Sequence, residues 1–199
     1  DTSVTGVQTC ALPICTIFLT EVEAKSLTDL NGLKLRVPGS PAAKLRYKTL
    51  GVEAVSISFS DVPIALAQKS IDGLMTTHET VRSAKLWESG LKYSIDTQGV
   101  FYQYVPMIGK PTWDKLGSDL QKIITDTWAE TVGPARDLAA ARQLSARDKG
   151  IANGIANIKA DDKDLAAFRA KLMKKQGDII KKTRINADFA ASAAAVLGK

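Results

Sequence analysis

The stretch LKLRVPGSP, residues 33–41, is the part of the chain from which the rest is best interpreted. Apolar and basic residues alternate over its first five positions, which predicts a short strand with one apolar face. Ser40 with the proline after it predicts the N-cap and first position of a helix over residues 41–50. Arg36 is therefore expected near the carboxyl end of a strand, beside the N-terminus of a new helix.

An arginine in this position has two interpretations. Ligands of open α/β sheets bind at the carboxyl ends of strands, where helix N-termini favour anions, and a guanidinium matches a carboxylate in shape and charge. The alternative is that Arg36 pairs with a structural carboxylate or lies in solvent, which is the more common situation for arginine. This stretch alone leaves both interpretations open.

The composition is that of a globular protein of one or two domains. Of the 199 residues, 45% are hydrophobic and 24% are charged, which is enough apolar material for a core, and no run is long enough to span a membrane. A single histidine and two cysteines leave little material for a zinc site, so we expect neither a metal nor another cofactor. The net charge of +6 brings nucleic acid into consideration as a partner.

The first fifteen residues are expected to lie outside the protein proper. They have neither the charged start nor the sustained apolar segment of a signal peptide, and they resemble translated sequencing-adapter sequence. We therefore treat residues 1–15 as a non-native leader and leave Cys10 and Cys15 out of fold reasoning. A disulfide between these cysteines is the competing interpretation. If the leader is non-native, the natural start of the protein is missing.

Residues 16–100 alternate between strand and helix patterns. Apolar runs rich in β-branched residues predict strands, and runs that open with a hydroxyl residue followed by proline or an acid predict helices. The elements are expected at residues 16–19, 33–37, 41–50, 52–59, 60–68, 71–77, 78–88 and 92–96, with Ser60 as the N-cap of the helix over 60–68. Strands that alternate with helices predict a parallel α/β sheet with right-handed crossovers.

One long helix dominates the second half of the chain. The sequence SDLQ at residues 118–121 matches a capping box and opens a helical pattern to about residue 148, with a kink expected at Gly133-Pro134. We expect this helix to act as a brace. The side chains expected to pack on the sheet-bearing body are Leu120, Ile123, Ile124 and Trp128. The remaining elements are expected at 100–108 (strand), 111–116 (helical turn), 155–158 (strand) and 161–196 (helix capped by Asp161 or Asp162).

The order of several short motifs resembles the solute-binding proteins of TRAP transporters, the tripartite ATP-independent periplasmic family with dicarboxylate-type members. The matching segments are LNGLKLRVP at 30–38, FSDV at 59–62, IDG at 71–73 and KPTWDKL at 110–116, the last leading into a long helix. The likeness covers most of residues 29–148, and beyond residue 150 only the pattern matches. The ordered set, rather than any single segment, makes the likeness specific.

The resemblance implies a periplasmic-binding-protein-like, type II-like α/β fold whose two lobes close on an organic acid anion. It also implies an N-terminally truncated chain, with the first lobe incomplete and the long kinked helix bracing both lobes. Residues 16–100 would form the ligand-binding lobe, and residues 101–199 the remnant of the other lobe with the long helix and the C-terminal helices. The protein would be periplasmic, with its signal lost by truncation. It would deliver its ligand to a membrane permease without itself being embedded in the membrane.

The resemblance further implies a ligand site. In the family, an arginine at the position of Arg36 pairs with the ligand carboxylate, and an aromatic residue at the position of Phe59 lines the pocket. An amide often follows the Asp-Gly pair in the family, whereas this chain has Thr76 and Thr77 there. With Ser60, these five side chains stand where strands give way to helices, so we expect them to converge on one ligand. Taken singly, Phe59 fits a core position equally well, and the two threonines fit helix caps.

Three other functions compete with transport. An enzyme is disfavoured because His78 and Glu79 are helix neighbours that do not face each other, and no phosphate loop, nucleophile elbow or carboxylate pair stands out. Nucleic-acid binding is disfavoured because the lysines of the last helix are interleaved with apolar residues and lack an aromatic platform. The effector-binding domain of a cytoplasmic transcription regulator shares this architecture and stays as the alternative.

Overall fold

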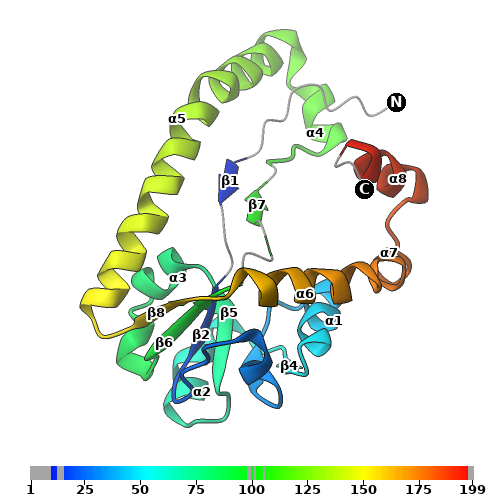
Figure 1. Ribbon diagram of the computed structural model, residues 1–199. Coiled ribbons are helices and arrows are strands. Elements are labelled where there is room, and N and C mark those ends of the chain that lie inside the picture. The colour runs from blue at the N-terminus through cyan, green and yellow to red at the C-terminus, as the bar shows by residue number, and fades with distance from the viewer. Residues whose placement is uncertain (1–9, 13–15, 98–99, 101, 105, 197–199) are drawn as a thin grey trace.

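The computed structural model describes residues 10–12, 16–97, 100, 102–104 and 106–196. Figure 1 shows a sheet-bearing body at one end, from which the long helix α5 (Gly117–Ala152) rises and arcs over to the far side of the molecule. The body is built on a six-stranded sheet of order β4–β3–β5–β2–β6–β8. Its strands are β2 (Thr16–Leu19), β3 (Lys34–Arg36), β4 (Glu53–Val55), β5 (Gly73–Thr76), β6 (Tyr93–Asp96) and β8 (Ala156–Lys159).

The sheet is mixed rather than all parallel. β3 runs parallel to both of its neighbours, β4 and β5, as strand–helix alternation predicts, and β6 runs parallel to β8. β2 lies between β5 and β6 and is antiparallel to both, so the expectation of a wholly parallel sheet is wrong at its centre. A short apolar run indicates a buried strand but contains nothing that sets its direction.

The close approach of β5 to β2 depends on a glycine. A Cβ added to Gly73 would lie 2.0 Å from the carbonyl oxygen of Phe18, the residue next to its partner Leu19 in the antiparallel ladder. Any side chain at this position would therefore push the two strands apart at the centre of the sheet. The Asp-Gly pair that resembles the family motif thus has a structural reason in this fold.

Two hydrophobic cores cover the two faces of the sheet. Successive side chains of β2 point to opposite faces, so Ile17 and Leu19 lie in one core and Phe18 lies in the other. The first core includes residues of α1 (Pro41–Thr49), α6 (Asp162–Met173) and the 3-10 turn η1 (Leu27–Leu30). The second includes residues of α2 (Val62–Ala67), α3 (His78–Ser83) and the 3-10 turn η3 (Leu86–Ser89). The sheet is thus covered on both faces, and its strand ends are the places open to a ligand.

Several local predictions are confirmed at residue level. The Ser40 hydroxyl accepts a hydrogen bond from the backbone N–H of Ala43 at 3.0 Å, so it caps α1. Asp161 likewise caps α6, its carboxylate accepting from the N–H of Lys163 at 2.7 Å. Several strands are shorter than expected, because only the residues that pair with neighbours count; β4, for example, ends at Val55 rather than at Phe59.

Two expected helices are interrupted by residues in the left-handed backbone region. The helix expected over 78–88 ends at Ser83 because Lys85 has φ +47°, and η3 follows it. The final helix breaks into three pieces: after α6 come α7 (Gln176–Thr183) and α8 (Ala187–Val196). The second break follows from Arg184, whose φ is +54°. Neither Lys85 nor Arg184 is a residue type whose sequence signals such a break.

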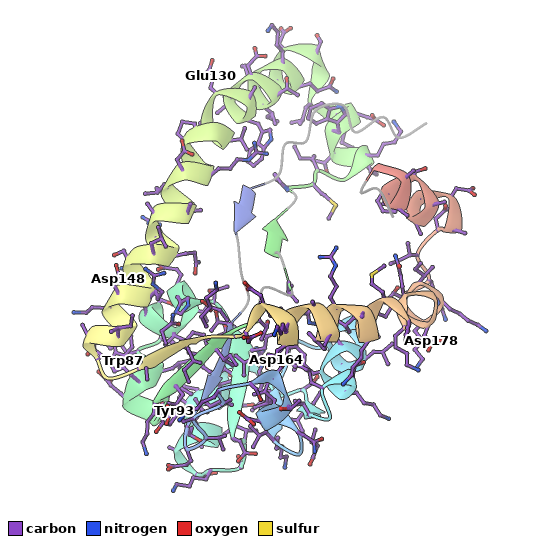
Figure 2. The ribbon with its side chains drawn as sticks, viewed as in Figure 1. Trp87, Tyr93, Glu130, Asp148, Asp164 and Asp178 are labelled. Carbon is purple, nitrogen blue, oxygen red and sulfur yellow. The ribbon has the colours of Figure 1, made fainter. Side chains whose placement is uncertain are left out.

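The capping box expected at residues 118–121 is wrong. α5 begins at Gly117, directly after the short helix α4 (Lys110–Lys115), so Ser118 lies inside its first turn instead of before it. The Ser118 hydroxyl contacts Asp119 at 3.2 Å, and the side-chain amide of Gln121 donates to the Trp113 carbonyl at 2.8 Å. The helix runs through Pro134 and bends, and Figure 2 places Glu130 in the curved part.

The brace helix contacts the body with a different part from the one expected. Leu120 and Ile123 are 50% and 58% exposed, so the prediction that they pack on the body is wrong, while Ile124 and Trp128 are half-buried. The opposite end of α5 packs against α3 instead. The buried residues of the helix are Val132, Gln143, Ala146 and Gly150. Among the described residues, no helix combines the length and apolarity of a membrane span.

Two observations bear on the expected division of the chain. β8, at residues 156–159, completes the sheet begun by residues 16–96, so the sheet crosses the boundary expected at residue 100. Within the expected leader, β1 (Cys10–Leu12) pairs antiparallel with β7 (Tyr102–Tyr104). Those three residues therefore take part in the fold, contrary to their exclusion from it. Cys15 lies outside the described residues, and with it the competing disulfide.

Candidate ligand-binding site

Arg36 ends β3 and lies beside Phe59, as the sequence predicts. Its Nε donates to the carbonyl oxygen of Ile57 at 3.4 Å, and its guanidinium carbon lies 5.6 Å from the centre of the Phe59 ring. Phe59 is 38% exposed, so one face of this cation–aromatic pair reaches solvent. The arginine is half-buried and precedes the capped N-terminus of α1. This arrangement provides the positive charge and the apolar surface that a small organic anion needs.

Ser60 does not have the helix-capping role expected for it. Residues Phe59–Asp61 form a 3-10 turn, and α2 begins only at Val62. The Ser60 hydroxyl lies 2.8 Å from the hydroxyl of Ser58 and is exposed. The regular helix therefore starts two residues later than predicted, with a proline at its second position. Ser60 thus lies in the same 3-10 turn as Phe59, ahead of the helix it was expected to cap.

The two threonines after β5 have different surroundings. Thr76 is the last residue of the strand, is 7% exposed and lies directly opposite Thr16 of β2. The Thr77 hydroxyl accepts from the N–H of Thr80 at 3.1 Å and caps α3, the structural role that the sequence also allows. Thr76 is thus part of the sheet edge, whereas Thr77 is engaged in starting the next helix.

A polar cluster at the same sheet edge was not predicted. Thr16 donates to the Asp96 carboxylate at 2.7 Å, and Nε2 of His78 lies 3.7 Å from the same carboxylate oxygen and 3.4 Å from the Thr16 hydroxyl. The His78 ring also stacks edge-on against Phe18, with 5.2 Å between ring centres. These residues come from β2, β6 and the start of α3. The antiparallel insertion of β2, which the sequence does not reveal, is what brings them together.

The charge of Asp96 is maintained despite its partial burial. Burial acts to raise the pKa of the Asp96 carboxyl, but the interactions with His78 and Thr16 and the nearby charge of Arg147 outweigh it and lower that pKa below its ordinary value. Asp96 is therefore an anion at neutral pH. The sequence gives only one weak indication that Asp96 belongs to a site: it is an acid at the carboxyl end of a predicted strand.

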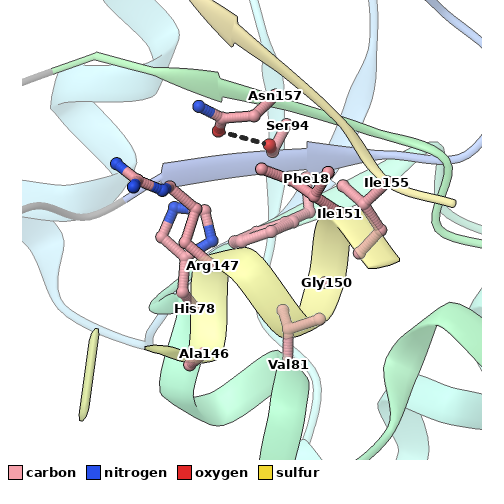
Figure 3. A pocket seen from close by; sticks show the side chains of 10 residues that line it. All are labelled: Phe18, His78, Val81, Ser94, Ala146, Arg147, Gly150, Ile151, Ile155 and Asn157. Carbon is pink, nitrogen blue, oxygen red and sulfur yellow. Dashed lines mark hydrogen bonds between the residues drawn. The ribbon is translucent and has the colours of Figure 1, made fainter. Parts of the chain in front are cut away.

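The C-terminal end of α5 holds this cluster in place from one side. Gln143 is buried and accepts a hydrogen bond from the backbone N–H of Glu79 at 3.2 Å, which joins α5 to the first turn of α3. Figure 3 shows Arg147 of α5 beside His78, above a cavity lined by Phe18, Val81 and Ile151. That cavity has no room for a water molecule, so it is a packing gap and not a ligand pocket.

A larger groove opens on the other face of the sheet edge. It has a volume of about 390 Å³ and lies between the β3–α1 turn and the facing parts of α6 and α7. Its lining is mostly apolar and comprises Pro38, Ser40, Ala42, Ala43, Arg46, Met75, Val100, Leu172, Met173, Gln176 and Ile179. It shares no residue with the five predicted ligand-binding side chains. Among the described residues, no group of histidine, cysteine and acidic side chains is arranged to hold a metal ion.

Comparison with known protein families decides what this architecture is. The family model for "Bacterial extracellular solute-binding protein, family 7" matches residues 17–182, from β2 into α7. The chain belongs to this family. The match confirms the resemblance to TRAP solute-binding proteins, and it supports that identification rather than a regulator's effector domain.

Individual family 7 proteins match over part of their length. The sialic acid-binding periplasmic protein SiaP of Vibrio cholerae is 32% identical over 110 residues, which are 55% of this chain and 34% of SiaP. The 2,3-diketo-L-gulonate-binding periplasmic protein YiaO of Escherichia coli is 28% identical over 119 residues, 60% of this chain and 36% of YiaO. The matched part thus spans about a third of the length of these curated relatives.

Solved structures of family 7 proteins share the fold. A TRAP periplasmic solute-binding protein of Bradyrhizobium with bound galacturonate superposes with a TM-score of 0.82 at 20% identity, covering 98% of this chain and 62% of that one. Another from Ralstonia eutropha H16, with bound (S)-2-acetolactate, gives a TM-score of 0.80 at 22% identity over 96% of this chain and 62% of that one. Both support the two-lobed periplasmic-binding-protein fold predicted from the sequence.

Proposed function

We propose that this chain is the solute-binding component of a TRAP transporter and captures an organic acid anion. The observation that supports this most directly is Arg36 at the end of β3, half-buried and stacked on Phe59, within a chain that family 7 matches over residues 17–182. Relatives named for sialic acid, diketogulonate and galacturonate support a carboxylate-bearing ligand.

In the proposed site, each of five residues has a different role. Arg36 pairs with the ligand carboxylate, and Phe59 covers apolar ligand surface. Ser60 and Thr76 offer hydroxyls at the rim and at the strand end, and Thr77 contributes through the helix start that it caps. Residues 16–100 are the proposed ligand-binding lobe. Its sheet also includes β8, a strand from later in the chain that pairs with β6. Residues 101–199 are then the proposed remnant of the second lobe, with the long helix.

The proposal extends to location and partners. A family 7 protein of this kind acts in the periplasm and hands its ligand to membrane permease subunits. It binds its ligand without chemical change, so we propose no catalysis, no cofactor and no nucleic-acid partner. The family and the relatives described above are named as solute-binding proteins, which supports this part of the proposal.

The test is to measure binding of sialic acid, 2,3-diketo-L-gulonate and D-galacturonate by ligand-observed NMR, which also registers weak complexes. Arg36→Ala is expected to weaken binding by less than the roughly 2–5 kcal/mol that removing one partner of a buried charged pair costs, because Arg36 is only half-buried. Arg36→Lys is expected to lose affinity as well, because an ammonium cannot form the planar fork. Lys48→Ala, which removes an exposed charge from the same stretch, is the control. Unchanged binding in both Arg36 variants would remove Arg36 from the site.

A further inference from the structure

The strand register places a row of polar side chains along one face of the sheet edge. Thr16 lies directly opposite Thr76 on one side and Asp96 on the other, and directly opposite residues of antiparallel strands point to the same face. Arg36 is paired with Leu74, two residues before Thr76, so it shares that face too. The row therefore runs Arg36, Thr76, Thr16, Asp96 across the four adjacent strands β3, β5, β2 and β6.

The two ends of this row carry opposite charges. Arg36 is a cation at one end, and Asp96 is an anion at the other, three strand spacings across and two residues along the strands, or roughly 16 Å away between backbones. Two threonines lie between them. An extended ligand whose carboxylate meets the Arg36 guanidinium would pass the end of β5, where Thr76 stands, on its way to Asp96.

The Asp96 carboxylate has capacity for a further hydrogen bond. Among the described residues, Thr16 and His78 both approach its Oδ1 atom. The side chain is 21% exposed, so a ligand can reach it. A carboxylate accepts hydrogen bonds from hydroxyl or ammonium groups, and it repels another carboxylate.

We propose that the bound ligand lies along this row with its carboxylate at Arg36 and a hydroxyl- or amine-bearing end at Asp96. The site would then select hydroxylated or aminated monocarboxylic acids over dicarboxylic acids of the same length. This inference rests on the proposed function and deepens it, because it assigns the end of the site that rejects a second negative charge.

One nearby cation opposes this selectivity. Arg147 of α5 lies beside His78 and attracts the charge of Asp96. Its Nε and one terminal nitrogen are hydrogen-bonded to the exposed Asp148 at 3.3 and 3.2 Å, so its guanidinium is directed to a carboxylate of its own helix. If Arg147 instead turned to the ligand, dicarboxylic acids would be favoured, and the experiment separates the two outcomes.

The experiment compares D-gluconate with D-glucarate, two acids of the same carbon skeleton that end in a hydroxyl and in a second carboxylate. The chain is expected to bind gluconate at least about tenfold more tightly, a difference of about 1.4 kcal/mol. Asp96→Asn keeps an acceptor for Thr16 but removes the charge, and is expected to bring the ratio close to one. Asp126→Asn removes an exposed charge that is paired with Lys122 and should leave the ratio unchanged.

Each result supports or overturns the inference. Equal or stronger binding of glucarate by the unaltered chain overturns it, and this comparison needs no variant to fold. A preference for gluconate that persists in folded Asp96→Asn also overturns it, because the selectivity would then come from elsewhere. Binding of galacturonate but of neither linear acid overturns it as well. Only the failure of every acid tested, including galacturonate, would count against the proposed function itself.

Discussion

The sheet-bearing body and the distal part of the molecule differ in how far their large apolar side chains are exposed to solvent. The distal part comprises α4, the residues of α5 before Pro134, and α8, which lie far from the sheet in Figure 1. Both hydrophobic cores belong to the body, where Phe18 is completely buried. In the distal part, Phe189 is 69% exposed and Met107, just before α4, is 86% exposed.

This difference separates two sources of stability. The body is stabilised by burial from both faces of a sheet, so opening it exposes many apolar groups at once. The distal helices bury few apolar side chains, with Val132 of α5 as an exception, so they are held mainly by their own backbone hydrogen bonds, which contribute little when a helix is not packed. We therefore expect the body to unfold as one cooperative unit and the distal part to open locally at much lower free energy.

The largest expected effect is that of truncating a core phenylalanine. Phe18→Ala should lower the free energy of unfolding by about 3–5 kcal/mol, because it removes a fully buried ring from the central strand. Phe189→Ala, the matched change in the distal part, should change it by less than about 0.5 kcal/mol. Urea unfolding followed by circular dichroism measures both. Similar losses in the two variants would show that the distal part is as well packed as the body.

Next in size is the replacement of the glycine that lets β5 approach β2. Gly73→Ala should cost about 1–3 kcal/mol, since the new Cβ meets the Phe18 carbonyl at 2.0 Å. Gly177→Ala in α7 meets nothing within 4 Å and should be neutral or slightly stabilising. The midpoint of thermal unfolding reports the difference. A neutral Gly73→Ala would mean that the two central strands are not held as closely as described.

The two serines that the sequence marks as helix starts should respond differently. Ser40→Ala is expected to cost about 1 kcal/mol because it removes the hydroxyl that caps α1. Ser118→Ala should cost at most a few tenths, because Ser118 lies inside the first turn of α5 and caps nothing. Chemical denaturation of the two variants side by side checks this. A larger loss for Ser118→Ala would restore the capping box.

The smallest expected effect is the acid sensitivity that Asp96 gives the body. Because its pKa is lowered from the ordinary 3.8 in the folded protein, Asp96 stabilises the fold at higher pH and loses that contribution as the pH falls through the folded pKa. Desolvation opposes its partners, so the net effect is small. Asp96→Asn should flatten the acid limb of stability against pH below about 4. An unchanged limb would show that His78 and Thr16 do not stabilise the charge.

Local signals in the sequence predict the elements that depend on local contacts. The strand, turn and capped helix around Arg36 are encoded within residues 33–50, and Arg36 and Phe59 come together as expected. The cluster of Thr16, His78 and Asp96 escapes such reasoning, because it depends on β2 pairing antiparallel with strands that lie far along the chain. The place of His78 at the start of a predicted helix follows from the sequence, but its contact with Asp96 does not.

Local sequence patterns also do not predict where the long helix begins or which of its faces packs against the body. A serine, an acid and a glutamine in sequence match a capping box, but α4 runs almost directly into α5 and leaves no free helix start there. The apolar stripe at Leu120 and Ile123 resembles a packing face in any helical pattern. Only the three-dimensional arrangement shows that the body is contacted by residues near Ala146 instead.

The pairing of β6 with β8 has a consequence for the order in which the chain is made. Ser94 and Ala156, neighbours across these two strands, are 62 residues apart in sequence, with the whole of α5 between them. At a synthesis rate of about 5–20 residues per second, the outer edge of β6 waits roughly 3–12 s for its partner to emerge from the ribosome. During that time an unpaired strand edge is open to other nascent chains. The long helix therefore sets the interval for which the outer edge of β6 stays unpaired.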